Sequence, residues 1–239
     1  MSTTEIFGGC VRSAMGSSAV VMATLFGFVQ PAVAISLNSL TNFNNLSNEG
    51  WSGLAPLVQP DGGPLGVGDP FLRAESHGGA SGGSRMAIYD DFSDWTGDYA
   101  TAGVTAVAAD MANLGSTVLS MRIVLFNLSS NRFTSTISIS LPADGQWHHL
   151  TFPIDSASLT RVSGSLSYTT LIHDVSRLMF RHDDSTPSSG GTPIVSSCGF
   201  DNIRAVPAPG TAGVGLLAAT WAARRARRVA AAAPSIGNL

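Results

Sequence analysis

Apolar and polar residues alternate along three consecutive stretches of the chain, and this pattern most constrains the fold. From Thr117 to Phe126 the large apolar residues occupy every second position, as they do again from Phe133 to Leu141 and from Leu150 to Ile154. Successive side chains of a strand point to opposite faces, so each stretch predicts a strand with one buried face. Turn-forming Asn, Pro, Asp and Gly residues separate the stretches, at 127–132 and 142–145. We therefore expect three strands joined by short turns, as in an antiparallel meander.

Shorter apolar runs predict further strands at Met86–Tyr89, Gly103–Asp110, Val175–Arg181 and Phe200–Val206, and residues 157–171 have room for a short helix or turn. Many short strands with Gly-rich turns and little helix are typical of a two-layer β architecture. The predicted fold class is all-β: an antiparallel, two-sheet, jelly-roll-like β-sandwich with an N-terminal signal helix and a short C-terminal hydrophobic helix on either side of it.

The first 34 residues have the composition of a secretory signal peptide. Arg12 supplies a positive charge, Ala19–Val29 is an unbroken apolar run, and Ala32-Val33-Ala34 matches an A-x-A cleavage site. The apolar run is too short to span a membrane comfortably. We expect cleavage after Ala34 by signal peptidase, delivery by the export machinery, and a mature domain at residues 35–206.

A tail at residues 207–239 follows this domain. Pro207, Ala208 and Pro209 precede an uncharged segment, Gly210–Ala223, and a basic cluster made by Arg224, Arg225, Arg227 and Arg228. This order resembles the PEP-CTERM sorting signal of Gram-negative bacteria. The resemblance implies recognition by an exosortase-type membrane protease, transient anchoring in the inner membrane, and a final location in the cell envelope or at the outer surface. The apolar segment is shorter than the roughly 20 residues of a relaxed membrane helix, which favours a processed signal over a permanent anchor. A surface helix ending in basic residues is the alternative.

The charged residues exclude several classes of function. The chain contains no lysine, which rules out a Walker phosphate loop, a Schiff-base lysine and a Ser-Lys dyad. Residues 35–206 hold 8 arginines and 15 acidic residues, a net charge of 8 − 15 = −7. Nucleic-acid binding needs a basic surface, so an acidic domain of this kind argues against it.

The middle domain contains, in order, the short motifs Gly66–Phe71, Met86–Asp91, Trp95–Tyr99 and Leu119–Phe126, and later Gly145–Trp147 and Phe200–Ile203. The first four resemble laminin IV type A (laminin B) domains and related galactose-binding-like sandwiches, and the last two also resemble carbohydrate-binding jelly rolls. The resemblance implies a β-sandwich and a role in binding extracellular polysaccharide. It also implies that Asp201 binds a structural ion, with a hydrogen bond at a turn or strand edge as the alternative.

Four tryptophan and tyrosine residues are candidates for stacking on sugar rings, since an aromatic face offers a flat apolar surface. We expect Trp95 and Tyr99 to bind ligand in this way, and Trp51 and Trp147 to lie in the core.

An acidic cluster suggests a structural Ca²⁺, because Ca²⁺ takes six to eight oxygen ligands. Its members are Asp90, Asp91, Asp94 and Asp98, to which the resemblance adds Asp201. Solvated loop carboxylates are the alternative, and no other cofactor is expected.

Three functions remain open. The leading hypothesis is an exported, envelope-sorted surface or matrix protein with a non-catalytic β-sandwich that binds exopolysaccharide. The second is a glycan-active hydrolase on a jelly-roll scaffold, whose paired carboxylates the sequence alone does not reveal. The third is a purely structural surface protein.

Overall fold

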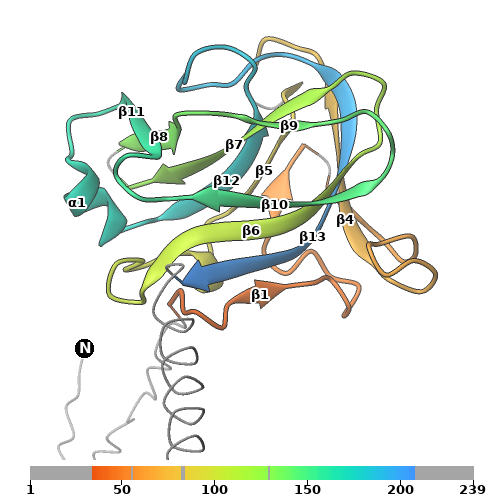
Figure 1. Cartoon of the computed structure of the whole chain (residues 1–239), viewed down its shortest axis with the longest axis horizontal. Helices are drawn as coiled ribbons and strands as arrows, with labels where there is room; N and C mark the ends of the chain where they lie inside the picture. Colours follow the sequence, from red (N-terminus) through yellow and green to blue (C-terminus); the bar gives the residue numbers. More distant parts are fainter. Residues whose placement is uncertain (1–33, 55, 82–83, 129, 208–239) are drawn as a thin grey trace, which may run out of the picture. The chain divides into compact units, whose positions relative to one another are not determined.

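A computed structural model describes residues 34–54, 56–81, 84–128 and 130–207, which form two antiparallel β-sheets packed face to face (Figure 1). This arrangement confirms the predicted all-β sandwich of two antiparallel sheets. The predicted signal peptide, apart from Ala34, and the predicted tail after Pro207 lie outside the described residues. Within the described residues, no helix has the length and apolar character needed to span a membrane.

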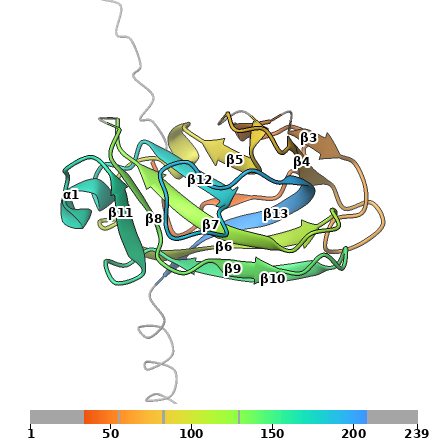
Figure 2. The ribbon, with the colours of Figure 1, turned by 90° about the horizontal axis from the view of Figure 1, so that it is seen from above.

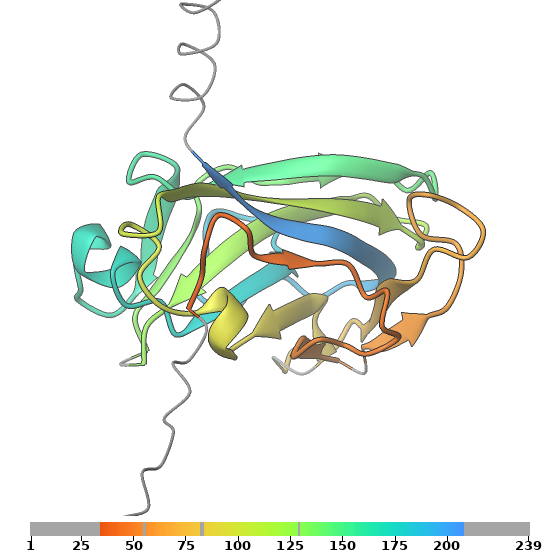
Figure 3. The same ribbon diagram turned by 90° about the horizontal axis from the view of Figure 1, so that it is seen from below.

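Sheet A contains the last strand of the domain near its centre. Its strands are β1 (Leu40–Thr41), β3 (Leu57–Gln59), β4 (Phe71–His77), β6 (Val104–Asn113), β10 (Trp147–Pro153) and β13 (Val195–Pro207). The order is β10-β6-β13-β4-β3, and β1 also pairs with β13. Figure 3, where β13 is blue, shows β1 and β6 on opposite sides of it.

Sheet B lies on the other side of the core. Its strands are β2 (Ser52–Gly53), β5 (Ala87–Asp90), β7 (Leu119–Phe126), β8 (Arg132–Ser135), β9 (Ile139–Leu141), β11 (Leu159–Ser163) and β12 (Arg177–His182). The order is β11-β8-β7-β12-β5-β2, and β9 also pairs with β7. A 3₁₀ turn (Ser93–Trp95) follows β5, and the helix α1 (Tyr168–Ile172) lies beside β11 at one end of the sandwich, away from β3 (Figure 2).

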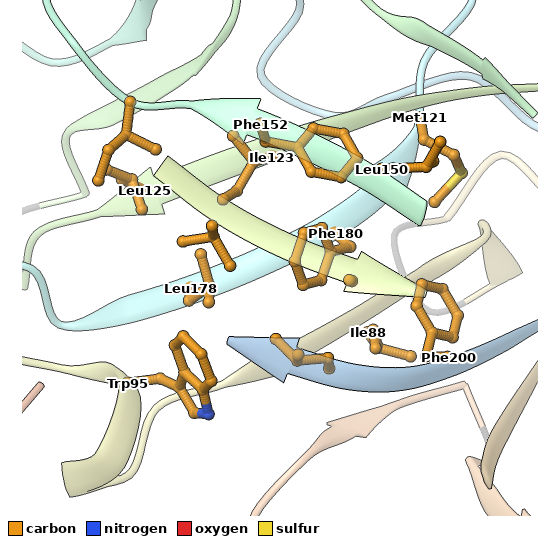
Figure 4. Close-up of a cluster of buried hydrophobic side chains, with 14 of the residues drawn as sticks. Ile88, Trp95, Met121, Ile123, Leu125, Leu150, Phe152, Leu178, Phe180 and Phe200 are labelled. Carbon is orange, nitrogen blue, oxygen red and sulfur yellow. The ribbon is translucent and has the colours of Figure 1, made fainter. Parts of the chain in front are cut away.

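Alternate residues of both sheets face inward and form one buried core, part of which Figure 4 shows. Phe180 of β12 lies at its centre, where its ring stacks on Trp51 at a centroid distance of 5.8 Å and packs against Phe152 at 5.3 Å. Phe200 of β13 lies 6.3 Å away. These aromatic contacts join sheet B to sheet A, and each fully buried ring removes a large apolar area from water.

Four predicted strands are confirmed with small changes of boundary, as β5, β6, β12 and β13. The segment 157–171 contains β11 as well as part of α1, where only a helix or turn was expected. Strand β4 was not predicted, because its first two residues are both apolar: Leu72 faces the core and Phe71 faces the opposite side.

The predicted strand from Phe133 to Leu141 is wrong as a single element, because it divides into β8 and β9. The two strands pair with opposite ends of β7, and the chain between them bends outward so that Ile137 is 80% exposed. The Arg122 side chain of β7 binds at this bend, donating to the carbonyl oxygens of Ser135 at 2.6 Å and Thr136 at 2.9 Å.

The predicted meander is also wrong at its third strand. β10 does not pair with β9 but crosses to sheet A, where it pairs with β6. Leu150 and Phe152 still face the core, so the alternation predicted which side chains are buried but not which sheet holds them.

Candidate functional site: an arginine groove on sheet B

The two aromatic residues expected to stack on sugars are instead part of the core. Trp95 and Tyr99 are both 0% exposed. The Trp95 indole N–H donates to Thr41 Oγ1 at 3.1 Å, and the Tyr99 hydroxyl donates to the Trp95 carbonyl oxygen at 2.9 Å. Sugar stacking needs an exposed ring face. Burial therefore corrects the prediction of a ligand platform at these residues.

The two tryptophans expected in the core differ from each other. Trp51 is fully buried, as expected. Trp147 is half-buried on the outer face of sheet A, where it meets Phe71 edge-on at a centroid distance of 5.2 Å and donates from its indole N–H to the Gly62 carbonyl oxygen at 3.0 Å. Its ring lies close against the strand, since a Cβ on Gly199 would come within 2.9 Å of it.

The side chains of the predicted acidic cluster do not converge on one point. Asp91 pairs with Arg177 at 2.6 Å, and Asp98 with His173 at 2.9 Å. The bond from His173 and those from Thr101 lower the pKa of Asp98 to about 2. Asp94 is exposed. No three His, Cys, Asp or Glu side chains within the described ranges are arranged to hold a metal ion.

Asp90 and Asp201 are buried carboxylates with an incomplete set of partners. They are 0% and 1% exposed, and Asp90 Oδ2 and Asp201 Oδ1 accept no hydrogen bond from the residues that the structure describes. Burial raises the pKa of Asp90 to about 6. Burial, together with the nearby carboxylates of Asp69 and Asp110, raises that of Asp201 to about 7. A buried charge without a partner is costly, so each group favours a proton or a cation.

A different constellation occupies the outer face of sheet B. Of the 8 arginines in residues 35–206, five belong to this face or its rim: Arg85, Arg122, Arg132, Arg177 and Arg181. Strand alternation places them there, because their neighbours in sequence on β7, β8 and β12 point into the core.

Register brings these arginines side by side in two rows. Arg132 of β8 lies opposite Phe126 of β7, which lies opposite Arg177 of β12. Two residues further along β12, Met179 continues the same face, and then Arg181 lies opposite Arg122.

Between these rows and the loop at residues 183–191 lies a cavity of about 170 Å³. A second cavity of about 340 Å³ adjoins it, and both are lined by Phe126, Arg132 and Arg177. The smaller cavity is also lined by Arg85, Met179 and Arg181. We call the two cavities together the arginine groove.

Two of the five arginines hold the loop in place. Arg122 and Arg181 are 4% and 3% exposed, and both approach the fully buried carboxylate of Asp183, with Arg181 Nη2 at 3.2 Å. Arg122 also donates to the carbonyl oxygen of Ser185 at 2.7 Å, and Arg181 donates to that of Ser188. These bonds tie the loop to the sheet and form one wall of the groove.

The other three arginines are half-buried and present their side chains to the groove. Arg85 donates to the carbonyl oxygens of Gly190 at 2.7 Å and Gly191 at 2.8 Å. Arg132 donates to the Ser189 carbonyl oxygen at 2.8 Å. The Arg177 guanidinium lies 4.4 Å from the centre of the Tyr89 ring.

Several hydrogen-bond donors of the groove lack an acceptor among the described residues. The Nε atoms of Arg85, Arg132, Arg177 and Arg181 are buried and have no hydrogen-bond partner within residues 34–54, 56–81, 84–128 and 130–207. Buried donors are nearly always paired in folded proteins, so four such atoms on one face call for a further group. The local signal in the sequence is alternation. Arg122 lies on the strand face opposite Met121 and Ile123, and Arg177 and Arg181 alternate with the core residues Leu178 and Phe180.

No protein-family model matches the sequence, and no curated protein matches it. Among solved structures, an exo-β-agarase shares 12% identity at a TM-score of 0.49, covering 72% of this chain and 25% of its own. A family 11 carbohydrate-binding module of the Clostridium thermocellum cellulase Lic26A-Cel5E shares 13% identity at a TM-score of 0.44, covering 73% of this chain and 96% of its own. A CBM28 module specific for non-crystalline cellulose shares 12% identity at a TM-score of 0.42, covering 71% and 93%. This chain thus spans about a quarter of the agarase. Because these TM-scores lie below 0.5, nothing about its ligand follows from them.

Proposed function

We propose that this jelly-roll-like sandwich is a non-catalytic module that binds extracellular polysaccharide in the arginine groove. The observation that carries the proposal is the groove itself, two adjoining cavities on a sheet face where Phe126 and Met179 supply apolar surface beside half-buried arginines. Binding sites for small ligands combine apolar walls with a few convergent polar groups, and planar guanidinium groups suit sugar hydroxyls and carboxylates.

The carboxylates that pair with the groove arginines do not favour the hydrolase hypothesis. Glycoside hydrolysis requires two carboxyl groups that face the scissile bond, one of them able to donate a proton. Asp91, on the wall of the larger cavity, is paired with Arg177, and Asp183 is fully buried between Arg122 and Arg181. Both carboxylates are engaged by arginine side chains and Asp183 has no exposed surface, so the two do not face a bound chain as a catalytic pair would.

Native-gel retardation against a panel of soluble polysaccharides tests the proposal. Met179→Trp fills the groove without changing charge and is expected to abolish retardation. The matched control Thr151→Trp adds the same ring at an exposed position of sheet A and is expected to leave retardation unchanged. Retention of binding by Met179→Trp would exclude the groove. Release of reducing ends would establish the hydrolase instead, and the absence of any polysaccharide ligand would favour a purely structural protein.

We also propose that the sandwich is exported and sorted to the cell envelope. The support comes from the sequence: a signal peptide at 1–34 and a tail at 207–239 that resembles an exosortase substrate. Intact-mass measurement of the mature protein from envelope fractions is expected to show an N-terminus at Ile35 and a processed C-terminus. Replacement of Arg224, Arg225, Arg227 and Arg228 by Gln is expected to block tail processing. An unprocessed C-terminus in a soluble periplasmic protein would contradict sorting.

Structural Ca²⁺ remains a proposal at Asp201 alone. Its buried and unpartnered Oδ1 is the feature that a cation would satisfy. Carboxylate oxygen is a ligand that Ca²⁺ prefers, and backbone carbonyls or waters commonly complete its shell.

A further inference from the structure

The arginine groove carries an excess of positive charge within an acidic domain. Five arginines gather on this face, and two carboxylates, those of Asp91 and Asp183, ion-pair with them. Residues 35–206 as a whole carry 8 − 15 = −7. The arginines of this face therefore outnumber the carboxylates they pair with, within a domain that is acidic overall.

The arginines also act on one another across the cavity. Burial, opposed by Asp183 and reinforced by repulsion from Arg132, Arg122 and Arg85, lowers the pKa of Arg181 to about 10. Like charges held this close, with buried Nε donors that have no acceptor, store an unfavourable interaction that an anion would relieve.

The geometry at Phe126 defines where such an anion would lie. The guanidinium carbons of Arg132 and Arg177 lie 5.0 Å and 5.5 Å from the centre of this one ring. Phe126 lies between the two arginines in the sheet register and lines both cavities. A ring beneath two guanidinium groups fixes their planes, and fixed planar forks recognise carboxylate and sulfate oxygens in pairs.

Building on the proposed function, we propose that the groove selects anionic polysaccharides, whose carboxylate or sulfate groups bind between Arg132 and Arg177 above Phe126. The sugar ring next to the anion then covers Met179 and the wall formed by residues 188–190. A neutral polysaccharide offers hydroxyl groups only, and would cover the arginines without neutralising them. Covering an uncompensated charge costs free energy, which gives the groove a basis for rejecting neutral chains.

The test uses polygalacturonate and its fully methyl-esterified form, which share a backbone and differ in charge. Titration calorimetry in low salt is expected to show polygalacturonate binding at least about tenfold more tightly, because a charge-assisted hydrogen bond is the difference between them. Binding is expected to weaken as NaCl rises, since surface charge interactions are screened. Sulfated and desulfated galactans form the second matched pair and decide whether sulfate replaces carboxylate.

Arginine variants connect the selectivity to the groove. Arg132→Gln and Arg177→Gln are each expected to weaken polygalacturonate binding about tenfold and to reduce the preference for polygalacturonate over the methyl ester, which then covers one uncompensated charge fewer. Arg73→Gln is the matched control, because Arg73 lies on the outer face of sheet A in an exposed ion pair with Glu75 at 2.7 Å. Circular dichroism spectra of all variants check that each remains folded.

The outcomes separate this inference from the proposed function. If the protein bound the charged and esterified polymers with equal affinity, and Met179→Trp abolished both, polysaccharide binding in the groove would stand. Anion selectivity would then be overturned. If Arg73→Gln weakened polygalacturonate binding as much as Arg132→Gln does, the net charge of the protein would explain the weakening. The arginine groove would then not be the binding site. Competition by inorganic phosphate at the same concentration as the polymer's sugar units would show an anion site without polysaccharide selectivity, which also contradicts the proposal.

Discussion

Raising the pH from 5 to 8 is expected to destabilise the sandwich through Asp201. Burial, followed by the carboxylates of Asp69 and Asp110, raises the pKa of this side chain to about 7. In the unfolded chain the pKa returns to about 3.9. The folded state therefore binds the proton more tightly, so this contribution to stability is complete below pH 4 and is lost as the pH rises through 7.

The size of the effect follows from proton linkage. With those two pKa values, the contribution of Asp201 to the free energy of unfolding falls by about 2.5 kcal/mol between pH 5 and pH 8. Other groups titrate in the same range. Burial raises the pKa of Asp90 to about 6, which acts in the same direction, and lowers the pKa of His182, which acts in the opposite direction. A variant that removes only the carboxyl group of Asp201 isolates its share.

Urea denaturation followed by tryptophan fluorescence, in EDTA at both pH values, measures this share. The isosteric variant Asp201→Asn keeps every other titrating group, so the wild type is expected to lose about 2.5 kcal/mol more than the variant on going from pH 5 to pH 8. An equal pH dependence of the two proteins would show that Asp201 has an ordinary pKa. A larger loss in the variant would refute the reasoning outright.

Three further changes probe the core, the loop and the ion. Phe180→Ala removes the ring that joins both sheets and is expected to lower the free energy of unfolding by about 3–5 kcal/mol in urea denaturation. The control Ile137→Ala, at an 80% exposed position, is expected to lower it by under about 0.5 kcal/mol. Similar losses in the two variants would contradict the assigned core. Asp183→Asn leaves the buried arginines Arg122 and Arg181 without their carboxylate and is expected to lower the free energy of unfolding by about 3–5 kcal/mol. An unchanged stability would mean that the loop at residues 183–191 does not depend on these ion pairs. Ca²⁺ at 100 times its dissociation constant is expected to stabilise the wild type by about 2.7 kcal/mol at pH 8, measured by thermal unfolding. The same Ca²⁺ concentration is expected to leave the stability of Asp201→Asn unchanged. An equal shift in both proteins would place the ion elsewhere.

The limits of sequence-based prediction are clearest on β7 and its neighbours. The residues of β7 that face the core repeat with a strict period of two, and such a local pattern needs no knowledge of the partner strands. The next run has the same pattern, yet Thr134 is fully buried and Ile137 is exposed. The bend between β8 and β9 depends on pairing with both ends of β7 and on the Arg122 side chain, neither of which a local pattern contains.

The candidate site was beyond prediction for the same reason. Arg85, Arg132 and Arg177 are separated by 40 or more residues in sequence and belong to different parts of the fold. Only the order β8-β7-β12-β5 makes them neighbours. Tryptophan was a misleading guide to the ligand, because Trp95 is conspicuous in sequence but serves the core. A residue type suggests chemistry, whereas exposure decides whether that chemistry is available to a ligand.

The two outer faces of the sandwich differ in what they leave for a ligand. On sheet A, Asp110 binds His149 at 2.7 Å and Asn202 at 2.9 Å, and His149 in turn contacts Arg204 at 3.1 Å. A ligand there would have to replace bonds that these side chains already make with one another, and the net gain would be small. On sheet B, the groove arginines have Nε donors without acceptors among the described residues and repel one another across a cavity. An anion placed there reduces this repulsion, and the ion pair between Arg177 and Asp91 is the carboxylate contact with which it competes. Binding free energy is therefore available on sheet B, and it is available chiefly to a ligand that carries negative charge.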